Sequence, residues 1–556
     1  MLKVFKKINP IFHPLILIII FSIPTVYALT ASGFYGASDD IHIAWLYEMT
    51  QTLKNGQFPP RYVPDLSFGF GYPLFNFVFP FPYYLGALFY FIGFSLVAST
   101  KIVFGLSIVL SGLAMYWLLR QILGRIYAVV GGVIYIYTPY RAIDIYYRGD
   151  IGESVAFIFF PLVLLAVYQL TVCRVCHRRW YGVGSLGLAG LILSHNIAAY
   201  MFVPLLILFS TIRILSNPTD IFRQAVKVMF MFVLGLAGAV YFWLPAILDS
   251  QLVKYDTVYN YVDHFPSLLQ LLAPYSTSKL AAPDPYGNQS YYLGTLGIIL
   301  LIFSSVFFIR RYKQISGDRN MLYLWALISI ALSIFMMNFR SDIIWKSLPF
   351  LPYFQFPWRF LMLTTLLFPF LLIPLSQIPH KVIPLVLIIS AILTTYQLFR
   401  PHDFLSRGDD YYLNRYIPMP KASEEYKLTK EEYLRLLKLT DVRPDRNYQL
   451  FFANEGVEQI NGDQLLNVSV ETNSPFPFIL NIRRYTFPGW KAYIDGNQTT
   501  LGAGRPFGQL SLLIPAGQHN VQIKFKETDF KLILDMISLF AMGLSLVFIL
   551  DSRKNV

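Results

Sequence analysis

The chain has 556 residues, of which 55% are hydrophobic, 17% aromatic and only 14% charged. Soluble proteins carry roughly 25% charged residues, so this composition excludes a soluble globular enzyme, and the hydrophobicity excludes a disordered chain. A net charge of +13 would suggest nucleic acid in a soluble protein. In a membrane protein the surplus Lys and Arg belong in short cytoplasmic loops. We therefore expect a multi-pass membrane protein without a nucleic-acid partner.

A membrane span needs about 20 mostly apolar residues. The first such run, 14–30, follows Lys3, Lys6 and Lys7, which indicates a cytoplasmic N-terminus. A cleaved signal peptide is the alternative, but no small-residue cleavage site follows the run. The further expected spans are 99–119, 126–139, 155–172, 181–194, 197–212, 228–247, 292–309, 320–337, 360–376, 382–397 and 531–550.

Together these segments make about twelve membrane spans. They give a consistent topology with both termini in the cytoplasm. Every loop placed in the cytoplasm is short and carries Lys or Arg, and the external loops are the long ones. Segment 77–95 is apolar enough to span but would invert the later topology, so we expect a juxtamembrane or re-entrant helix there. The predicted location is the plasma (inner) membrane. The predicted domains are a transmembrane module at 1–397, an extracytoplasmic, mainly β domain at 398–529, and a last span with a cytoplasmic tail at 530–556.

The first external loop, 31–98, is expected to carry surface helices. Between Asp40 and Leu53 the apolar residues Ile43, Leu46 and Met49 recur at three-residue spacing. This pattern predicts an amphipathic helix on the membrane surface, whose N-terminus Ser38 or Asp39 can cap.

The second external piece, 398–529, changes character along its length. Its early stretch 421–438 is charged and predicted helical. After it, apolar and polar residues alternate in short segments separated by the turns NGD, DGN and PAGQ. Such alternation predicts a β-sandwich.

Two acidic residues, Asp39 and Asp40, follow the first span, with His42 and Glu48 on the helix after them. Acidic residues at a helix start can simply interact with its dipole. They can also act as a general base or hold a divalent cation at the external membrane face. Spacing alone leaves both interpretations open.

The next external loop carries several charges between apolar spans. These charges are costly beside a bilayer unless they are paired or used. Arg141 with Asp144 and Arg148 with Glu153 could pair internally, or the arginines could bind phosphate oxygens. The charged residues are Arg141, Asp144, Arg148, Asp150 and Glu153, which follow Tyr140.

Two further sets lie on the same face. His195, between Ser194 and Asn196, can cap a helix or act in catalysis. Arg359 in FQFPWRF can contact a lipid phosphate, or the segment can be an interfacial anchor with Trp358 at headgroup level.

The sequence CRVCH at Cys173–His177 matches the c-type haem attachment pattern. That attachment takes place outside the cytoplasm, whereas this loop is predicted to be inside, and a zinc site needs about four ligands. We therefore expect no haem and interpret these as ordinary loop residues. No nucleotide-binding motif is present either, so no nucleotide is expected.

The segments GFGYPLFN, FPYYLGALF, PYRAIDIYYRGDIGES, LSHN and FQFPWRF occur in this order over about residues 30–375. They resemble the bacterial membrane proteins named 6-pyruvoyl-tetrahydropterin synthase-related. The layout is similar to C-type (GT-C) glycosyltransferases, and PGWKAYIDG with IPAGQHNVQIKF resembles the external β-domain of YfhO-like members. The resemblance implies a catalytic Asp after the first span, here Asp39 or Asp40. It also implies an acid in the next external loop, here Asp144, Asp150 or Glu153.

The fold class expected is thus a polytopic α-helical, GT-C-like membrane protein with an extracytoplasmic β-sandwich before its last span. The expected function is transfer of a sugar from a polyprenyl-phosphate carrier to a glycan, lipid or protein of the cell envelope. Asp39 or Asp40 would activate the acceptor hydroxyl, with or without a divalent cation bound there. The alternative is a non-catalytic transporter or scaffold that binds a lipid-linked glycan. The expected substrate-binding and phosphate-binding set is His42, Arg141, Asp144, Arg148, Asp150, Glu153, His195 and Arg359.

Overall fold

The structure is a computed structural model that describes residues 12–173, 176–216, 220–254, 261–272, 291–378, 382–417, 434–445, 451–453, 463–464 and 466–551. The predictions on Lys3, Lys6 and Lys7, on the tail after Asp551 and on most of the helical stretch 421–438 lie outside these residues. Of that stretch only 434–438 is described, and it forms no helix.

Eight helical segments of the described chain are long and apolar enough to cross a membrane. Each overlaps a predicted span. They are α5 (Leu96–Leu123), α8 (Ile151–Val172), α10 (Asn196–Leu215), α11 (Ile221–Gly238), α14 (Thr295–Arg311) with its short extension to Gln314, α15 (Gly317–Met336), Pro357–Leu375 and α22 (Asp529–Asp551).

Shorter helices cover the other predicted spans. They are α1 (Phe12–Val26) with its short extension to Thr30, α6 (Arg125–Ile136), α9 (Arg179–Ser194) and α19 (Val382–Thr395) with the turn Tyr396–Leu398. The expected single span 228–247 is wrong in one respect, because α11 ends at Gly238 and a separate α12 (Val240–Leu248) follows.

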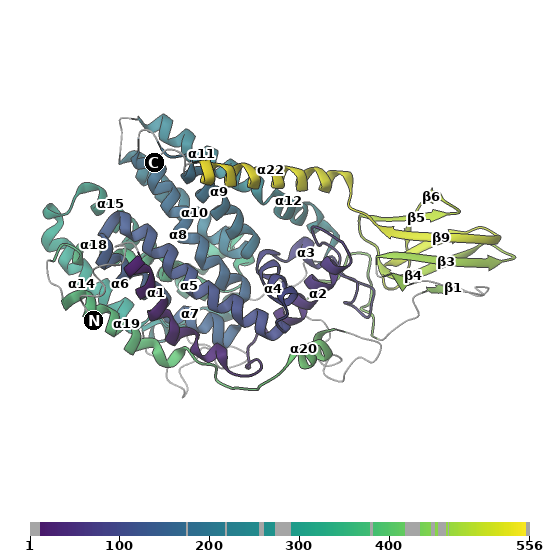
Figure 1. The fold of residues 1–556 in the computed structure, drawn as a ribbon, viewed down its shortest axis with the longest axis horizontal. Helices are drawn as coiled ribbons and strands as arrows, with labels where there is room; N and C mark the ends of the chain where they lie inside the picture. The colour runs from purple at the N-terminus through teal and green to yellow at the C-terminus, as the bar shows by residue number, and fades with distance from the viewer. Residues whose placement is uncertain are drawn as a thin grey trace.

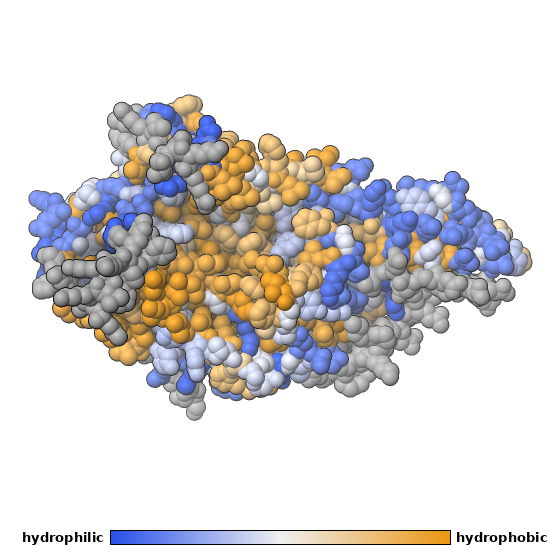
Figure 2. Space-filling view, in the orientation of Figure 1, coloured by the Kyte–Doolittle hydropathy of each residue, from blue (hydrophilic) through white to orange (hydrophobic). Residues whose placement is uncertain are grey.

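The helices form one body with an apolar belt. Figure 2 shows hydrophobic residues across its middle and hydrophilic residues at both ends. In Figure 1, α22 runs from the β-domain to the opposite end of the body, where α1 also begins. The protein is therefore a multi-pass membrane protein with a β-domain at one end. Small residues allow close helix contact in this body: a Cβ on Gly132 of α6 would lie 3.0 Å from the Gly112 carbonyl oxygen of α5.

The first long loop contains α2 (His42–Lys54), α3 (Leu74–Phe77) and α4 (Phe81–Ile92). The 12 residues of α4 span about 18 Å, too short for a hydrocarbon core of about 30 Å. The predicted cap of α2 is wrong: the helix starts at His42 after Ile41, without a side-chain cap. The carbonyl of Asp39 accepts the His42 N–H instead, which leaves the carboxylate available for other contacts.

The β-domain is a pair of antiparallel sheets, in the orders β1-β4-β8-β7 and β2-β3-β9-β5-β6. Inward residues of both, among them Val468, Leu480, Leu512 and Val521, form one apolar core, which confirms the predicted sandwich. The strands are β1 (Phe451–Ala453), β2 (Asp463–Gln464), β3 (Asn467–Ser474), β4 (Phe478–Tyr485), β5 (Trp490–Ile494), β6 (Asn497–Thr499), β7 (Gly502–Ala503), β8 (Gln509–Ile514) and β9 (Gly517–Phe525).

The first loop enters the core of this domain. Tyr62 is fully buried among the sandwich residues, and its hydroxyl donates to the Phe70 carbonyl at 2.5 Å. A backbone hydrogen bond also joins the loop to the β-domain, because the Tyr485 N–H donates to the Phe70 carbonyl at 2.7 Å. The β-domain is thus docked on the loop that contains α2.

The linker after α19 lies against the same loop. It contains α20 (Asp409–Tyr416), and the Asp409 carboxylate accepts the N–H groups of Leu96 and Val97 at the start of α5. Gly33 has φ +65°, and a Cβ there would lie 2.2 Å from the Ser406 carbonyl carbon. Only glycine permits this approach, so the linker and the start of the loop fit together as one unit.

The remaining connections are short helical turns. They are α7 (Pro139–Ile143), Asp144–Arg148, Asp249–Leu252, Tyr261–His264, α13 (Leu268–Leu272), Tyr312–Gln314, Phe339–Ser341, α16 (Asp342–Ser347) and Leu351–Phe354. The membrane-spanning segment Pro357–Leu375 is itself built from four short helical pieces, Pro357–Phe360, α17 (Leu361–Leu367), Phe368–Leu371 and α18 (Leu372–Leu375).

The cysteines of the CRVCH motif form a disulfide, Cys173–Cys176. The motif follows the end of α8, and the Lys227 amine on α11 lies 3.4 Å from the Cys176 sulfur. Our expectation of ordinary loop residues is therefore wrong for the two cysteines, which are covalently joined because their spacing brings them together after the helix end.

Candidate functional site

The site is built at the start of α8, where a wide π-turn at Asp144–Arg148 follows α7. Gly149 then takes a left-handed conformation, φ +77°, and Asp150 caps α8 by accepting the Glu153 N–H at 2.9 Å. Local π-type widening is frequent at functional sites. Here it directs Asp144, Arg148, Asp150 and Glu153 inward, where all four are buried.

Arg148 is the centre of this cluster. Its guanidinium lies 2.9 Å from Asp144 Oδ1 and 2.9 Å from Asp150 Oδ2, and it also pairs with Glu153. Asp39 Oδ2 is a fourth, more distant oxygen at 3.9 Å. One cation is thus shared by several carboxylates, and removal of this shared partner would leave buried charges uncompensated.

Asp39 occupies the open edge of the cluster. Its side chain is 33% exposed, whereas those of Asp144, Arg148, Asp150 and Glu153 are at most 6% exposed. Burial raises the pKa of Asp39 to about 6, opposed by Arg148 and reinforced by Asp150. This carboxyl group is the most exposed acid of the cluster.

Asp40 points elsewhere. It is 6% exposed, and the Tyr416 hydroxyl of α20 donates a hydrogen bond to its Oδ1. The two neighbouring acids, equivalent by sequence, therefore differ in environment: Asp39 faces Arg148, and Asp40 is held by the linker.

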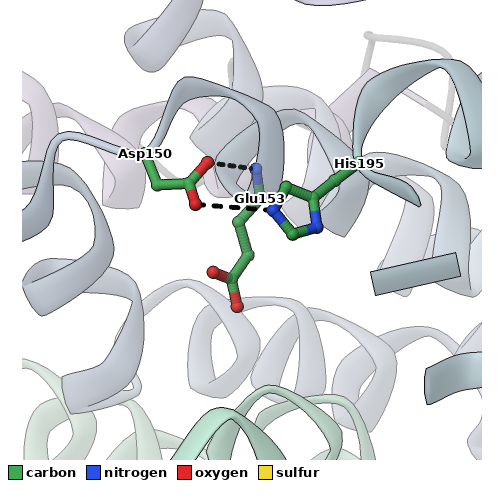
Figure 3. Close-up of side chains that lie close together, drawn as sticks. All are labelled: Asp150, Glu153 and His195. Carbon is green, nitrogen blue, oxygen red and sulfur yellow. Dashed lines mark hydrogen bonds and ion pairs between the residues drawn. The ribbon is translucent and has the colours of Figure 1, made fainter. Parts of the chain in front are cut away.

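His195 joins the cluster from the junction of α9 and α10 (Figure 3). Its Nδ1 accepts the Ala198 N–H at 3.0 Å, so it caps α10, while Nε2 lies 3.5 Å from Asp150 Oδ2. An acceptor Nδ1 places the proton of the neutral ring on Nε2. His195 is thus both a cap and a donor directed at Asp150.

His42 lies near the cluster, beside the same Phe79 ring as His195. Its Nδ1 is 2.6 Å from the Tyr83 hydroxyl, and the Phe79 ring lies beside both His42 and His195. Burial lowers the pKa of His42 to about 4. The ring is therefore neutral at physiological pH and supplies polarity rather than charge.

The segment with Trp358 and Arg359 closes the other side. Trp358 is buried, and the Arg148 guanidinium lies 4.9 Å from its ring centre, so the interpretation of Trp358 as an interfacial anchor is wrong. Arg359 bonds the Phe354 carbonyl at 3.1 Å and Gln355 Oε1 at 2.6 Å. Its charge acts on Asp39 and Glu153 without direct contact.

Arg141, like Asp40, is a predicted site residue that the structure places apart from Arg148. It lies 4.1 Å over the Phe157 ring and donates to the Ser154 carbonyl and to Ser111 Oγ. The expected Arg141–Asp144 pair is therefore wrong, because Asp144 binds Arg148 and Ser154 Oγ instead. The expected Arg148–Glu153 pair is present.

A divalent cation was expected as a possible partner of Asp39 or Asp40, whereas the described residues that group as possible metal ligands are Asp150, Glu153 and His195. Oxygen and nitrogen atoms of Asp150, Glu153 and His195 lie within 4.8 Å of one another. However, Arg148 already pairs with both carboxylates, and the Nε2 of His195 is directed at Asp150. A cation would have to displace a guanidinium and a proton, so the arrangement fits a metal poorly.

Tyr83, Trp358 and Tyr416 contribute to the site without a sequence signal of their own. Tyr416 meets Asp40 across 376 residues, and Tyr83 meets His42 across 41. Tyr140, next to the predicted charges, donates to Glu153 Oε1 at 2.5 Å. Tyr140, beside Arg141, and Trp358, beside Arg359, could be inferred from proximity in the sequence.

The sequence profile of the 6-pyruvoyl-tetrahydropterin synthase-related domain, a membrane protein family, matches residues 75–400. The chain belongs to this family. The site lies largely within the matched part of this PTPS-related protein, while Asp39, Asp40 and His42 precede it. A protein of Lactococcus lactis subsp. cremoris without an assigned function is 23% identical over 261 residues, which is 45% of this chain and 41% of the relative.

Among solved structures, this PTPS-related protein is similar to arabinofuranosyltransferase AftD from mycobacteria, with TM-score 0.44, 13% identity and coverage of 70% of this chain and 27% of AftD. It is also similar to the oligosaccharyltransferase of Archaeoglobus fulgidus, with TM-score 0.41, 12% identity and coverage of 70% and 54%. The chain thus spans about a quarter to a half of the proteins it resembles.

Proposed function

We propose that this PTPS-related protein is a membrane glycosyltransferase of the GT-C type. It would transfer a sugar from a polyprenyl-phosphate carrier to an extracytoplasmic glycan, lipid or protein of the cell envelope. The observation that carries this proposal is the half-open carboxyl group of Asp39, positioned at the edge of an otherwise buried charged cluster. The similarity to two sugar-transferring membrane proteins agrees with it.

In the proposed reaction the acceptor hydroxyl oxygen attacks the anomeric carbon of the donor sugar. The bond from that carbon to the phosphate oxygen breaks, and the polyprenyl phosphate leaves with the bonding electrons. Asp39 takes the proton of the hydroxyl as general base. Arg359 would stabilise charge on the phosphate, because guanidinium groups match phosphate oxygens, while Arg148, already paired with three carboxylates, would offset their negative charge.

The poor fit to a metal assigns the positive charge of the site to Arg148 in this proposal. A fixed guanidinium needs no reorganisation as charge develops on the leaving group. Asp144, Asp150 and Glu153 would hold Arg148 in place, and His195 would orient Asp150. These residues are positioning residues, whereas Asp39 touches the substrate.

The proposed orientation puts both termini in the cytoplasm of the bacterial cell and the β-domain outside the inner membrane. Arg120 and Arg125 border the short turn between α5 and α6, and Arg310 and Arg311 end α14. Such short basic loops stay inside. The site and the β-domain then share the external face, so the β-domain can position the acceptor.

The test uses the full chain in lipid nanodiscs with a panel of polyprenyl-phosphate sugars and a bacterial envelope extract as acceptor. Release of polyprenyl phosphate is measured, since it is common to every donor sugar. We expect Asp39→Asn to lower the rate by about a hundredfold or more, as loss of a general base does. The exposed Asp410→Asn on α20 is the matched control and keeps the rate.

Full release by a folded Asp39→Asn protein would refute the assignment of the base. Saturable donor binding without any release in the native protein would favour the transporter or scaffold.

A further inference from the structure

A groove lies between the first loop and the β-domain, outside the site described above. It has a volume of about 780 Å³ and is lined by residues that follow α2 and by the ends of β3 and β9. The lining residues that matter here are Asn55, Phe58, Asn467, Lys524 and Lys526.

This groove is separate from the candidate catalytic site. Asn55 is the first residue after α2, whereas His42 starts that helix. The 13 residues of α2 extend about 20 Å, so the groove and the cluster lie at opposite ends of one helix. A ligand of the groove is therefore a different molecule, or a different part of one, from the group that meets Asp39.

The groove is positively charged. Lys524 and Lys526 are exposed. The acid Glu527 also lines the groove, but its Oε1 forms an ion pair with Arg61 Nε at 2.8 Å. Lys524 also lies directly opposite Lys491 in the register of β9 and β5, a like-charge pairing that destabilises a sheet. Within the described residues no ion pair joins these three lysines to a carboxylate. An anion bound here would relieve the repulsion.

The position of the lysines identifies the source of that anion. Lys526 precedes the membrane-spanning α22 by three residues, which places it at the level of lipid headgroups. Early residues of α22 such as Phe530 and Ile533 are 50% and 58% exposed, as expected of a lipid-facing helix. Phe58, at the other wall of the groove, is 71% exposed.

We propose that this groove binds the phosphate headgroup of an anionic lipid in the leaflet on the side of the β-domain. Lys524 and Lys526 pair with the phosphate, Asn55 and Asn467 offer hydrogen bonds, and Phe58 packs against the first carbons of the acyl chain. The bound lipid fixes the β-domain against the membrane next to α22. This inference goes beyond the proposed transferase function and does not depend on it.

The test is photo-cross-linking with the full chain in phosphatidylcholine nanodiscs that contain a small fraction of diazirine-labelled phosphatidylglycerol. We expect cross-links on the peptides that contain Phe58 and Lys526. Each basic residue at a membrane surface contributes an affinity factor of about five, so Lys524→Gln/Lys526→Gln is expected to lower this yield by tenfold or more. Both lysines are exposed, and a melting temperature that does not fall verifies the fold of the variant.

The matched control is Arg340→Gln/Lys346→Gln, which removes two external basic residues remote from the groove lining and leaves the yield unchanged. An equal yield with diazirine-labelled phosphatidylcholine, or an unchanged yield in the Lys524→Gln/Lys526→Gln protein, would overturn the proposal. Displacement of the lipid by inorganic phosphate alone would show a phosphate site without lipid recognition and would also overturn it.

Discussion

The Tyr416 hydroxyl donates a hydrogen bond to Asp40, while the adjacent Asp39 faces Arg148. The linker to the β-domain thereby fixes the backbone that presents Asp39. We expect Tyr416→Phe to lower the free energy of unfolding by about 1.5–3 kcal/mol, the usual loss for a hydrogen bond to a charged group. Thermal unfolding measures this change, and Tyr353→Phe, at a 57% exposed tyrosine, serves as the control. Equal melting temperatures would contradict the expectation.

Removal of the central cation should be costly. Arg148→Gln leaves Asp144, Asp150 and Glu153 buried without their common partner, which typically destabilises by about 3–5 kcal/mol. Protonation neutralises these acids, so the deficit relative to the native protein should shrink as the pH falls. Thermal unfolding at several pH values measures it. Arg178→Gln, which breaks an exposed pair with Asp551, should change stability by less than about 0.5 kcal/mol.

The pH dependence of transfer follows from Asp39. Its pKa of about 6 lies above the ordinary value of 3.8, so the base is protonated in weak acid. We expect kcat/KM to fall about tenfold per pH unit below this pKa and to be flat above it. A rate that stays constant across that pKa would contradict the role of Asp39.

The raised pKa of Asp39 also affects the stability of the fold, and here the effect of rising pH is opposite to its effect on the rate of transfer. Between the ordinary value and about 6 the folded protein holds a proton on Asp39 that the unfolded chain has lost. The contribution of Asp39 to stability therefore decreases as the pH rises through this window and is constant above it. The melting temperature of the native protein minus that of the Asp39→Asn protein should follow this course, and a value that rises with pH through this window would count against it.

Removal of divalent cations should have little effect on transfer. Arg148 supplies the positive charge at Asp150 and Glu153, so EDTA should change the release of polyprenyl phosphate by less than about twofold, in contrast to the large losses of metal-dependent enzymes. Loss of activity in EDTA that Mg²⁺ or Mn²⁺ restores would show that a cation binds despite the guanidinium.

The docking of the β-domain depends on Tyr62. Tyr62→Ala removes a fully buried ring from the sandwich core and should cost about 3–5 kcal/mol, detected as faster proteolysis of the β-domain. Tyr62→Phe keeps the ring and loses only the hydrogen bonds of its hydroxyl, to the Phe70 carbonyl and, more weakly, to the Tyr485 carbonyl, a loss of about 1 kcal/mol. Similar proteolysis of both variants would contradict this separation.

The apolar periodicity of the sequence was sufficient to predict most of the fold. Spans and alternating strands such as those around Val468 and Leu480 follow from burial patterns that repeat locally. The break at Gly238 within one expected span did not follow, because both flanks are equally apolar. The cap of α2 was mispredicted, because the tertiary contacts of Asp39 with Arg148 compete with local capping.

The candidate site was predictable in composition but not in pairing. The sequence shows that Arg148, Asp150 and Glu153 are close neighbours, yet it contains no signal that Asp144 prefers Arg148 over Arg141. That choice depends on the π-turn, which rotates Arg148 inward. The ranking of Asp39 over Asp40 depends on Tyr416, and contacts across hundreds of residues leave no trace in a single sequence.

The close fit of Gly33 against Ser406 has a mechanical consequence. Because no side chain fits between the two backbones, the loop with Asp39 and the tether of the β-domain move together. A displacement of the β-domain, by force or by ligand binding, would be transmitted through this linker to the site. Any larger residue at position 33 would force the two segments apart and so weaken the contact between the loop with Asp39 and the linker to the β-domain.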